Sequence, residues 1–190
     1  MASAVLNVED MTGALRGSAP AYASAAWSTA GEEPDEDSPL WSVATFLDSV
    51  SCVAAPSAAV EDTIGSTAWQ AYGWVGTDSV VDGSQVGVDE FLVSATTERV
   101  TALTDAMTEY LDGCEEFNPY SGTPTPFDIP TVGDQRYATV VDGGQGTTPV
   151  RRYVLIRQGE VLMGMWIRGV PRSDDDVAGA IITAAVNKLP

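Results

Sequence analysis

The stretch at residues 88–117 constrains the fold more than any other, because it joins a predicted strand directly to the longest predicted helix and holds one of only two cysteines. Its second half carries apolar residues at intervals of three and four, the spacing that lines one face of an α-helix. These residues are Val100, Leu103, Met107, Tyr110, Leu111, Cys114 and Phe117. The spacing predicts an amphipathic helix with one face in the core and the other in water.

The ends of this helix are marked by residue type. Hydroxyl side chains at residues 94–97 offer N-caps where the apolar period changes, and Gly113 predicts the C-terminal end. Ahead of the helix, Phe91 and Val93 alternate with Glu90, which is typical of a strand. The second cysteine of the chain is therefore expected in or just past the last helical turn.

The C-terminal third predicts an antiparallel meander followed by a helix. Three β-like runs, at residues 135–142, 150–157 and 160–167, are separated by short turns that contain glycine, as between neighbouring antiparallel strands. The last helix is predicted to begin at Ser173, and the aspartates that follow suit the first turn of a helix dipole. The predicted fold class is α+β, an antiparallel β-sheet with helices packed on one face.

The N-terminal part is predicted to wrap around that core. Residues 11–16 suggest a short helix, whereas residues 18–37 are rich in alanine, serine, proline and acidic side chains and have the composition of a loop. A further helix is predicted at residues 57–64, between a proline and a glycine. We divide the chain into an N-terminal extension, residues 1–50, and one compact domain, residues 51–190.

Charge and residue usage disfavour several classes of function. The 190 residues include 27 acidic and 9 basic side chains and no histidine, for a formal charge of −18. Such a surface repels nucleic acid and anionic bilayers, and strong acidity also keeps exported proteins soluble. Without histidine, the commonest general base and metal ligand is missing, and neither a nucleophile elbow nor a phosphate-binding glycine loop is present. We expect no catalytic residue, no metal and no cofactor.

The acidic run at residues 31–37 is interpreted as a solvated turn. Calcium could use such carboxylates, but the spacing of a helix-loop-helix calcium loop is missing.

The two cysteines, Cys52 and Cys114, leave two alternatives open. A minimal, even count fits one disulfide formed in an oxidising compartment, and the alternative is a pair of reduced thiols in a cytosolic protein. The first residues lack the basic and apolar regions of a signal peptide, and no run is long enough to cross a membrane. We favour the disulfide, and we expect an extracytoplasmic protein that meets the membrane only through an anchor preceding these residues.

Aromatic side chains gather just before the long helix, at Trp69, Tyr72 and Trp74, and another lies in the last predicted strand, at Trp166. Such rings usually form core. The functional alternative is a groove lined with rings that binds an apolar or flat ligand.

Most of the basic residues fall in the meander and its exit, at Arg136, Arg151, Arg152, Arg157, Arg168 and Arg172. They either pair with the surplus carboxylates and cover apolar surface, or capture an anionic ligand through bidentate contacts. Adjacent Arg151 and Arg152 must point to opposite faces of a strand. The candidate ligand-binding residues are Trp69, Tyr72, Trp74, Arg151, Arg157 and Trp166.

Four segments follow one another in a recognisable order: AWQAYGWV, VDEFLVSAT before a helix that ends LDGC, RRYVLIRQGEVLMGMWI, and a last helix that ends AAVNKLP. Over residues 52–190 this order resembles the PknH-like extracellular sensor domain of actinobacterial proteins, which occurs in receptor kinases and in stand-alone lipoproteins. The resemblance implies an antiparallel sheet with helices packed against it and a cleft for an extracellular ligand. Cys52 and Cys114 fit the family's first cysteine and the cysteine that closes its long helix.

The chain departs from the family pattern at two places. The second cysteine pair of the family is missing, with Pro149, Val150 and Arg151 where one member is expected, and Tyr110 or Leu111 replaces a tryptophan. These departures concern the ligand more than the fold.

The sequence therefore predicts an extracytoplasmic ligand-binding or sensor domain, secreted or lipid-anchored at the cell surface and without catalytic activity. The alternative is a structural or protein-interaction module of the envelope with no small-molecule ligand. A deep apolar cavity would favour the first, and a filled core with one flat apolar patch the second. A secreted hydrolase that uses carboxylates is the third possibility.

Overall fold

The computed structural model describes residues 5–15, 27–35, 41–50, 52, 69–81, 84–114, 123–142 and 150–190. Its helices are α1 (Val8–Ala14), α3 (Trp41–Val50), α5 (Thr97–Asp112) and α6 (Asp175–Val186), the last preceded by a 3-10 helix (Arg172–Asp174). Its strands are β1 (Trp27–Asp35), β2 (Trp69–Val81), β3 (Ser84–Ser94), β4 (Pro124–Pro126), β5 (Gln135–Val141), β6 (Arg151–Gln158) and β7 (Val161–Arg168). No helix in these ranges has both the length and the apolar character needed to cross a membrane.

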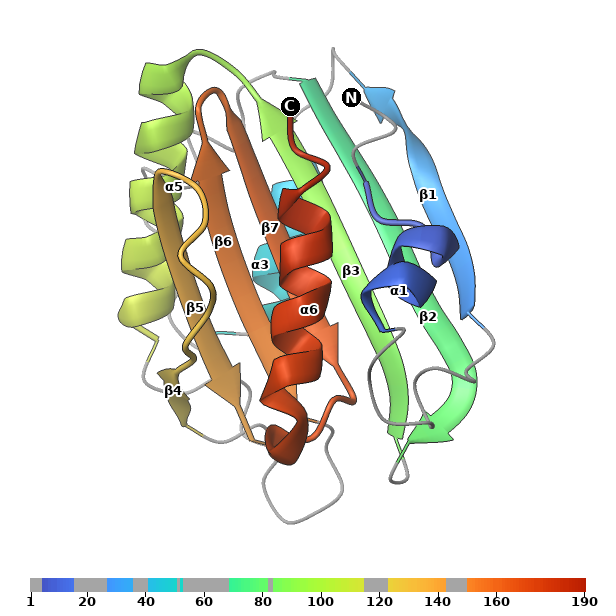
Figure 1. Cartoon of the computed structure of the whole chain (residues 1–190). Coiled ribbons are helices and arrows are strands. Elements are labelled where there is room, and N and C mark those ends of the chain that lie inside the picture. Colours follow the sequence, from blue (N-terminus) through green and yellow to red (C-terminus); the bar gives the residue numbers. More distant parts are fainter. Residues whose placement is uncertain are drawn as a thin grey trace.

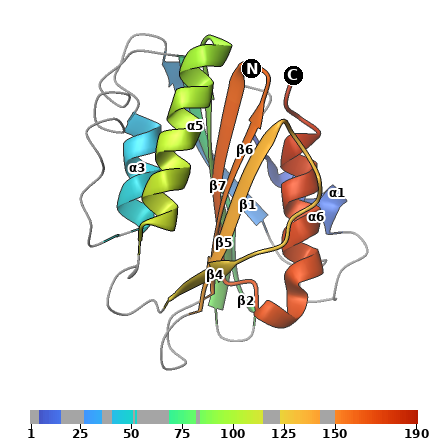
Figure 2. The same ribbon diagram turned by 90° about the vertical axis from the view of Figure 1, so that its left-hand side faces the viewer.

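One seven-stranded sheet, in the order β1-β2-β3-β7-β6-β5-β4, forms the middle layer, and every neighbouring pair of strands is antiparallel. Helices α3 and α5 cover one face, which we call the α3–α5 face, and α1 and α6 cover the other, the α1–α6 face (Figures 1 and 2). The predicted α+β class and antiparallel sheet are confirmed.

The placement of the helices corrects the prediction of a sheet covered on one face. Leu92 and Val93 are neighbours on β3 and point to opposite faces, yet each is only 1% exposed. Because the central strands are apolar on both sides, both faces must be covered to remove these side chains from water. The core is accordingly divided into two clusters, one on each side of the sheet.

The predicted strand–helix unit and the meander are confirmed. Helix α5 follows β3 after a two-residue connection and ends at Gly113, whose N–H donates to the carbonyl of Glu109. Its N-cap residue, Thr96, makes no side-chain capping bond, so packing of the apolar face rather than capping positions this end. Strands β5, β6 and β7 each begin and end within one residue of the predicted limits.

The N-terminal part contains more regular structure than its composition predicts. Strand β1 occupies a segment that was expected to be loop, and it pairs with β2 at the edge of the sheet. The register shifts between Glu32 and Asp35, so Pro34 falls at an irregularity of an edge strand, where a missing N–H is tolerated. The predicted helix at residues 57–64 lies outside the described residues.

Helix α1 begins three residues earlier than predicted, because Asn7 forms a capping box. The Asn7 side chain accepts hydrogen bonds from the N–H groups of Glu9 and Asp10, and Asp10 accepts in return from the Asn7 N–H at 2.9 Å. Two donors at the helix start are thereby satisfied reciprocally.

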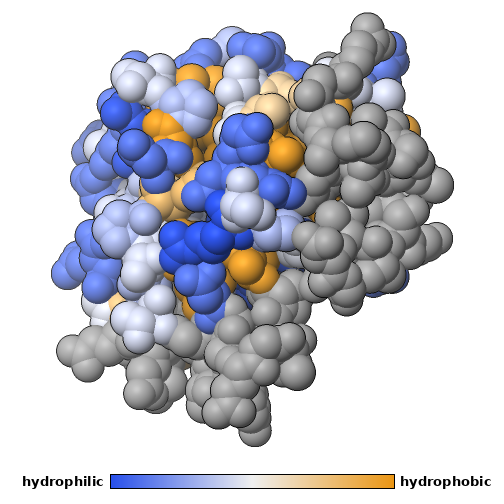
Figure 3. Space-filling model, turned by 60° about the horizontal axis from the view of Figure 1, so that its bottom comes forward, coloured by the Kyte–Doolittle hydropathy of each residue, from blue (hydrophilic) through white to orange (hydrophobic). Residues whose placement is uncertain are grey.

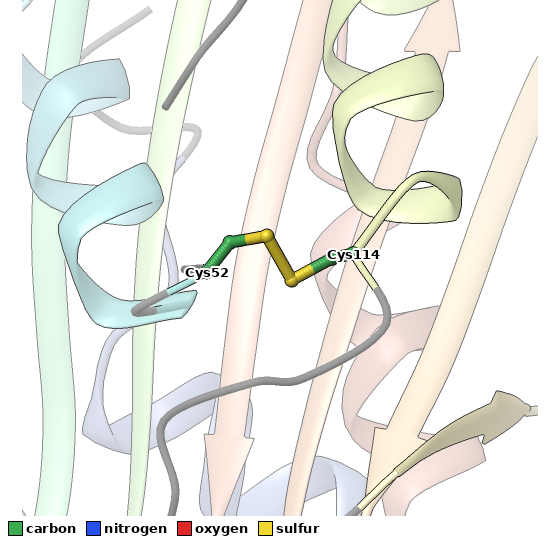
Figure 4. Close-up of a disulfide and its surroundings, with 2 residues drawn as sticks. All are labelled: Cys52 and Cys114. Carbon is green, nitrogen blue, oxygen red and sulfur yellow. A yellow bond between two sulfur atoms is a disulfide. The ribbon is translucent and has the colours of Figure 1, made fainter. Parts of the chain in front are cut away.

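The predicted disulfide is confirmed between Cys52 and Cys114, with their Cα atoms 5.8 Å apart (Figure 4). Cys52 follows the end of α3 and Cys114 follows the end of α5. The bond therefore ties together the two helices that cover the α3–α5 face.

A close contact across the sheet gives the first testable expectation. Gly164 on β7 lies opposite Phe91 on β3, and a Cβ added there would come within 1.9 Å of the Phe91 ring, which is fully buried. We expect Gly164→Ala to destabilise the domain by about 2 kcal/mol, because a packed core cannot absorb the extra methyl group without strain. Urea unfolding at constant m-value measures this effect.

The matched control is Gly179→Ala in α6, where an added Cβ meets no atom within 4 Å. That change is expected to stabilise the domain by about 0.5–1 kcal/mol through helix propensity. A Gly164→Ala protein as stable as the wild type would contradict the close contact.

Candidate functional site

The candidate aromatic residues are distributed over both faces of the sheet. Trp69 packs against the core of the α1–α6 face, whereas Tyr72 and Trp166 belong to the α3–α5 face. Trp74 lies two residues beyond Tyr72 on β2 and therefore points to the same side as Tyr72. Three of the four rings share a face, and Trp69 is separated from them by the sheet.

The rings on the α3–α5 face pack against one another. The Phe46 ring of α3 lies edge-on to Trp166, with centroids 5.8 Å apart, and to Tyr153, with centroids 5.9 Å apart. The Tyr72 and Trp166 rings lie 6.1 Å apart. Trp166 is only 7% exposed. These contacts are those of an aromatic core, in which edge-to-face pairs are favoured.

A polar cluster adjoins these rings at Asp89. The Tyr72 hydroxyl donates to Asp89 Oδ1 at 2.6 Å, and Arg168 Nη2 lies 3.3 Å from Asp89 Oδ2. Burial raises the pKa of Asp89, while the Tyr72 hydrogen bond and the Arg168 charge counteract that rise. Asp89 Oδ2 and Trp74 Nε1 are both buried and have no hydrogen-bond partner among the described residues. Since these two atoms lie beneath the surface, they do not themselves present a binding surface.

The two candidate arginines do not share a rim. Arg151 and Arg157 are six residues apart on β6, so about 20 Å of strand separates them. Arg151 lies opposite Arg168, and Arg157 lies opposite Gln135 at the other end.

Ion pairing accounts for most of the arginines in the meander and its exit. The pairs are Arg152–Asp175, Arg157–Asp134 at 3.4 Å, Arg168–Asp89 at 3.3 Å and Arg172–Asp142 at 2.9 Å. Arg151 and Arg152 point to opposite faces, as expected: Arg152 is fully buried, whereas Arg151 is partly exposed. The interpretation of these arginines as partners of the surplus carboxylates is therefore supported for these four.

A pocket of about 380 Å³ opens at the β4 edge of the sheet. Strand β4 pairs with only the last three residues of β5, so residues 135–138 have no neighbouring β4 residue, and the end of α5 lies above them. We call this space the β4–β5 pocket; it is lined by Leu111, Asp112, Pro124, Thr125, Pro126, Arg136, Tyr137, Ala138 and Thr139. The short β4 strand and the end of α5 that border it are visible in Figure 2.

The β4–β5 pocket combines groups of both charges with hydroxyls and a ring. Burial raises the pKa of Tyr137, and the nearby charge of Asp112 and the hydrogen bond with it raise the pKa further. The Tyr137 hydroxyl therefore keeps its proton through the neutral range and donates to the Asp112 carboxylate. Arg136 also lines the pocket and is exposed, but as the neighbour of Tyr137 on β5 it points to the opposite face of the strand. Such an arrangement can hold a small ligand that both donates and accepts hydrogen bonds.

Asp112, Arg136 and Tyr137 are not among the ligand-binding residues predicted from the sequence. A signal for the pocket was present in Pro124 and Pro126, because prolines on either side of one residue restrict a strand to a short edge position. The pocket itself depends on which strand lies beside that short segment, and residue type alone does not specify this.

A second, more open pocket of about 580 Å³ lies between α1 and α6. We call it the α1–α6 groove; it is lined by Glu9, Asp10, Gly13, Ala14, Ala180, Thr183, Ala184, Asn187 and Lys188. Its lining combines small side chains with polar and charged ones. In Figure 3, where described residues reach the surface, hydrophilic ones predominate and hydrophobic ones form separate small areas. In the described ranges, no group of three or more acidic, cysteine or histidine side chains could hold a metal ion.

No family model and no curated protein matches this chain. Among solved structures, the crystal structure of the extracellular domain of PknH from Mycobacterium tuberculosis is similar to it over 99% of this chain and 93% of that chain. The two share 11% sequence identity, with a TM-score of 0.49. The resemblance stated from the sequence thus recurs in the comparison of structures. The function proposed below therefore rests on the residues of this chain and not on that likeness.

Proposed function

We propose that this chain is a non-catalytic ligand-binding or sensor domain that acts outside the cytoplasm, secreted or anchored at the cell surface, and binds a small polar ligand in the β4–β5 pocket. The pocket carries the proposal. Its volume of about 380 Å³ lies within the range of about 300–1,000 Å³ that is usual for ligand sites. Asp112, Arg136 and Tyr137 supply a carboxylate, a guanidinium and a ring at its walls.

The disulfide supports the location. Both cysteines of the chain are used in the bond between Cys52 and Cys114. Disulfides of this structural kind persist in oxidising compartments and are rare in the cytosol. Cys114 lies two residues after Asp112, so the same bond also fixes one wall of the β4–β5 pocket.

The packing of the rings supports a polar rather than an apolar ligand. Phe46, Tyr72 and Trp166 contact one another where a ring-lined groove would have to open. In the β4–β5 pocket, by contrast, the threonine hydroxyls add to the charged groups. Thr139 donates to the Thr125 carbonyl at 3.0 Å, and Thr125 accepts from Arg172 at 2.6 Å.

A titration followed by nuclear magnetic resonance tests the proposal. We expect amino acids, short peptides or mono- and disaccharides, added one class at a time, to shift the amide signals of residues 136–139. For a probe that binds, Arg136→Gln and Tyr137→Phe are each expected to weaken binding about tenfold or more, because a hydrogen bond to a charged group contributes about 1.5–3 kcal/mol. Arg168→Gln, an equivalent change on β7, two strands away from β5, is the control and leaves the affinity unchanged. Shifts confined to the surroundings of Trp74 and Arg168 would contradict the assignment.

The α1–α6 groove favours a second candidate function, a protein-interaction module of the envelope. The small side chains of Gly13, Ala14, Ala180 and Ala184 leave a shallow space that side chains of a partner protein could fill. A photoreactive residue at position 184 is expected to give a protein adduct in intact cells under this interpretation. Reaction with water alone would exclude it.

A further inference from the structure

The described N-terminal residues form a strap across the α1–α6 face. The strap, residues 5–15, comprises an extended entry and helix α1, and it buries Leu6, Met11 and Leu15, which are at most 4% exposed. These side chains join the same core cluster as α6 and the sheet. Helix α1 lies beside α6 over β2 and β3 in Figure 1.

The sheet leaves space for the first residues of the strap. Val5 lies over Gly73 of β2, where an added Cβ would come within 2.1 Å of Val5 Cγ1. Gly73 is opposite Glu90 of β3 in the register of the two strands. Gly73, which has no side chain, leaves room for Val5, and the neighbouring Glu90 carboxyl group accepts a hydrogen bond from the Leu6 N–H. Together the two residues position the entry of the strap.

Glu90 binds the strap from below. Its Oε2 accepts a hydrogen bond from the Leu6 N–H at 2.7 Å, and the residue is 1% exposed. Its Oε1 is buried and has no hydrogen-bond partner within the described part of the chain. The backbone of the strap is therefore held by a carboxyl group that the strap itself shields from water.

The charged groups that face Glu90 come from two elements. Asp10 belongs to α1, and Lys188 follows α6. The Lys188 ammonium donates to the Val5 carbonyl and to Asp10 Oδ2, each at 2.5 Å. On the sheet, the residues opposite Glu90 are Gly73 and Met165, which do not titrate. The protonation of Glu90 therefore depends on burial under the strap, on Lys188 and on Asp10.

We propose that Glu90 makes docking of the strap depend on pH, so that the strap is held while Glu90 is protonated and is released as Glu90 ionises. The strap contacts this carboxyl group directly, so undocking is expected to return it to water. Ionisation and undocking are consequently linked, since an ionised carboxylate is strongly favoured in water over a buried site.

The direction in which docking changes with pH follows from the pKa of Glu90 in the docked and undocked states. Under the strap, burial raises the pKa of Glu90 from 4.5 to about 7, while the Leu6 hydrogen bond and Lys188 lower it and Asp10 raises it. After undocking, the group regains water and its pKa returns toward 4.5. Docking is therefore tightest below about pH 4.5, weakens as pH rises between the two values, and levels off above about pH 7. The full change is about 300-fold in the docking equilibrium.

Amide hydrogen exchange of the full chain tests this proposal. The N–H groups of Met11 and Leu15 are bonded inside α1 and report on the strap, whereas amides of α5 report on opening of the whole domain. After correction for intrinsic exchange, we expect strap protection to fall by about 30- to 100-fold between pH 5 and pH 8, with α5 amides unaffected. In Glu90→Gln the side chain cannot ionise, and strap protection is expected to be independent of pH.

Two further observations keep the test decisive. Glu9→Gln makes the same chemical change on an exposed side chain of the strap, and it is expected to retain the full pH dependence. The carboxyl carbon signal of Glu90 in the wild-type protein is expected to titrate with a midpoint near pH 7, whether or not the variant folds. The proposal is overturned if this midpoint lies near pH 4.5, if Glu90→Gln keeps the wild-type pH dependence, or if strap and α5 amides exchange at the same rate at every pH.

Discussion

Arg152→Ala is expected to destabilise the domain by about 3–5 kcal/mol. The Arg152 side chain is completely buried, and its guanidinium pairs with Asp175 at the start of α6. It also donates to the carbonyls of Val170 at 2.6 Å and Pro171 at 2.9 Å. Arg152 therefore fixes the connection between β7 and α6 to the middle of the sheet.

The cost arises from the groups that remain after the substitution. Without the guanidinium, the Val170 carbonyl loses its donor inside the protein, and an unsatisfied buried polar group costs about 1–3 kcal/mol. The contact of the guanidinium with the Phe127 ring, 5.3 Å from its centroid, is lost as well. A cavity the size of the arginine stem adds to both. Asp175 contributes less, because its side chain is 44% exposed and regains water.

Urea unfolding of Arg152→Ala, Arg152→Met and Arg157→Ala separates these contributions. Arg152→Met fills the cavity but leaves the carbonyls without a donor, so we expect it to recover part of the loss. Arg157→Ala is the control, because its ion-pair partner Asp134 is 55% exposed and the pair is longer, at 3.4 Å. It is expected to cost no more than about 1 kcal/mol. Equal effects of Arg152→Ala and Arg157→Ala would refute this account of Arg152.

Removal of the disulfide is expected to destabilise the domain by about 4 kcal/mol. Cys52 and Cys114 are 62 residues apart, and in the chain-entropy model a loop of this length restricts the unfolded chain by that amount. The double variant Cys52→Ala/Cys114→Ala avoids free thiols and their oxidation. Its free energy of unfolding is to be compared with that of the wild type with and without reductant.

Reduced wild-type protein and the double variant are expected to show the same loss of stability, and the oxidised double variant should be insensitive to reductant. A wild-type protein whose stability is unchanged by complete reduction would contradict the contribution assigned to this bond. Because the bond also fixes the end of α5, probes bound in the β4–β5 pocket should bind more weakly to the reduced protein.

Periodicity predicted the regular centre of the fold. The apolar spacing from Val100 to Leu111 gave α5, and the alternation and short turns of the C-terminal third gave β5, β6 and β7. These elements are determined by local patterns that the amino-acid sequence displays directly. The cysteine pair was also predicted, because two cysteines permit only one intramolecular bond.

Features that depend on long-range neighbours were not predicted. Strand β1 has a loop-like composition and is a strand because β2 offers it an edge. The placement of the helices on one face was wrong, because alternation of apolar and polar residues in β3 does not mean that one side is exposed: Leu92 and Glu90 are buried as well. For the candidate site, alternation along β2 could have separated Trp69 from Tyr72 and Trp74. The β4–β5 pocket follows from strand order, which residue type does not specify.

Burial of the central strands on both faces has a consequence for how this architecture can acquire binding partners. Where helices occupy both broad sides of a sheet, a new contact cannot be added over its middle without displacing a helix. Outside the α1–α6 groove, what remains among the described residues is the perimeter: β1 at one side, and β4, which pairs with only the last three residues of β5, at the other. Among proteins with this fold, sequence differences that change binding specificity should therefore accumulate at the perimeter strands. The residues on the two broad faces of the sheet are constrained by packing against the helices.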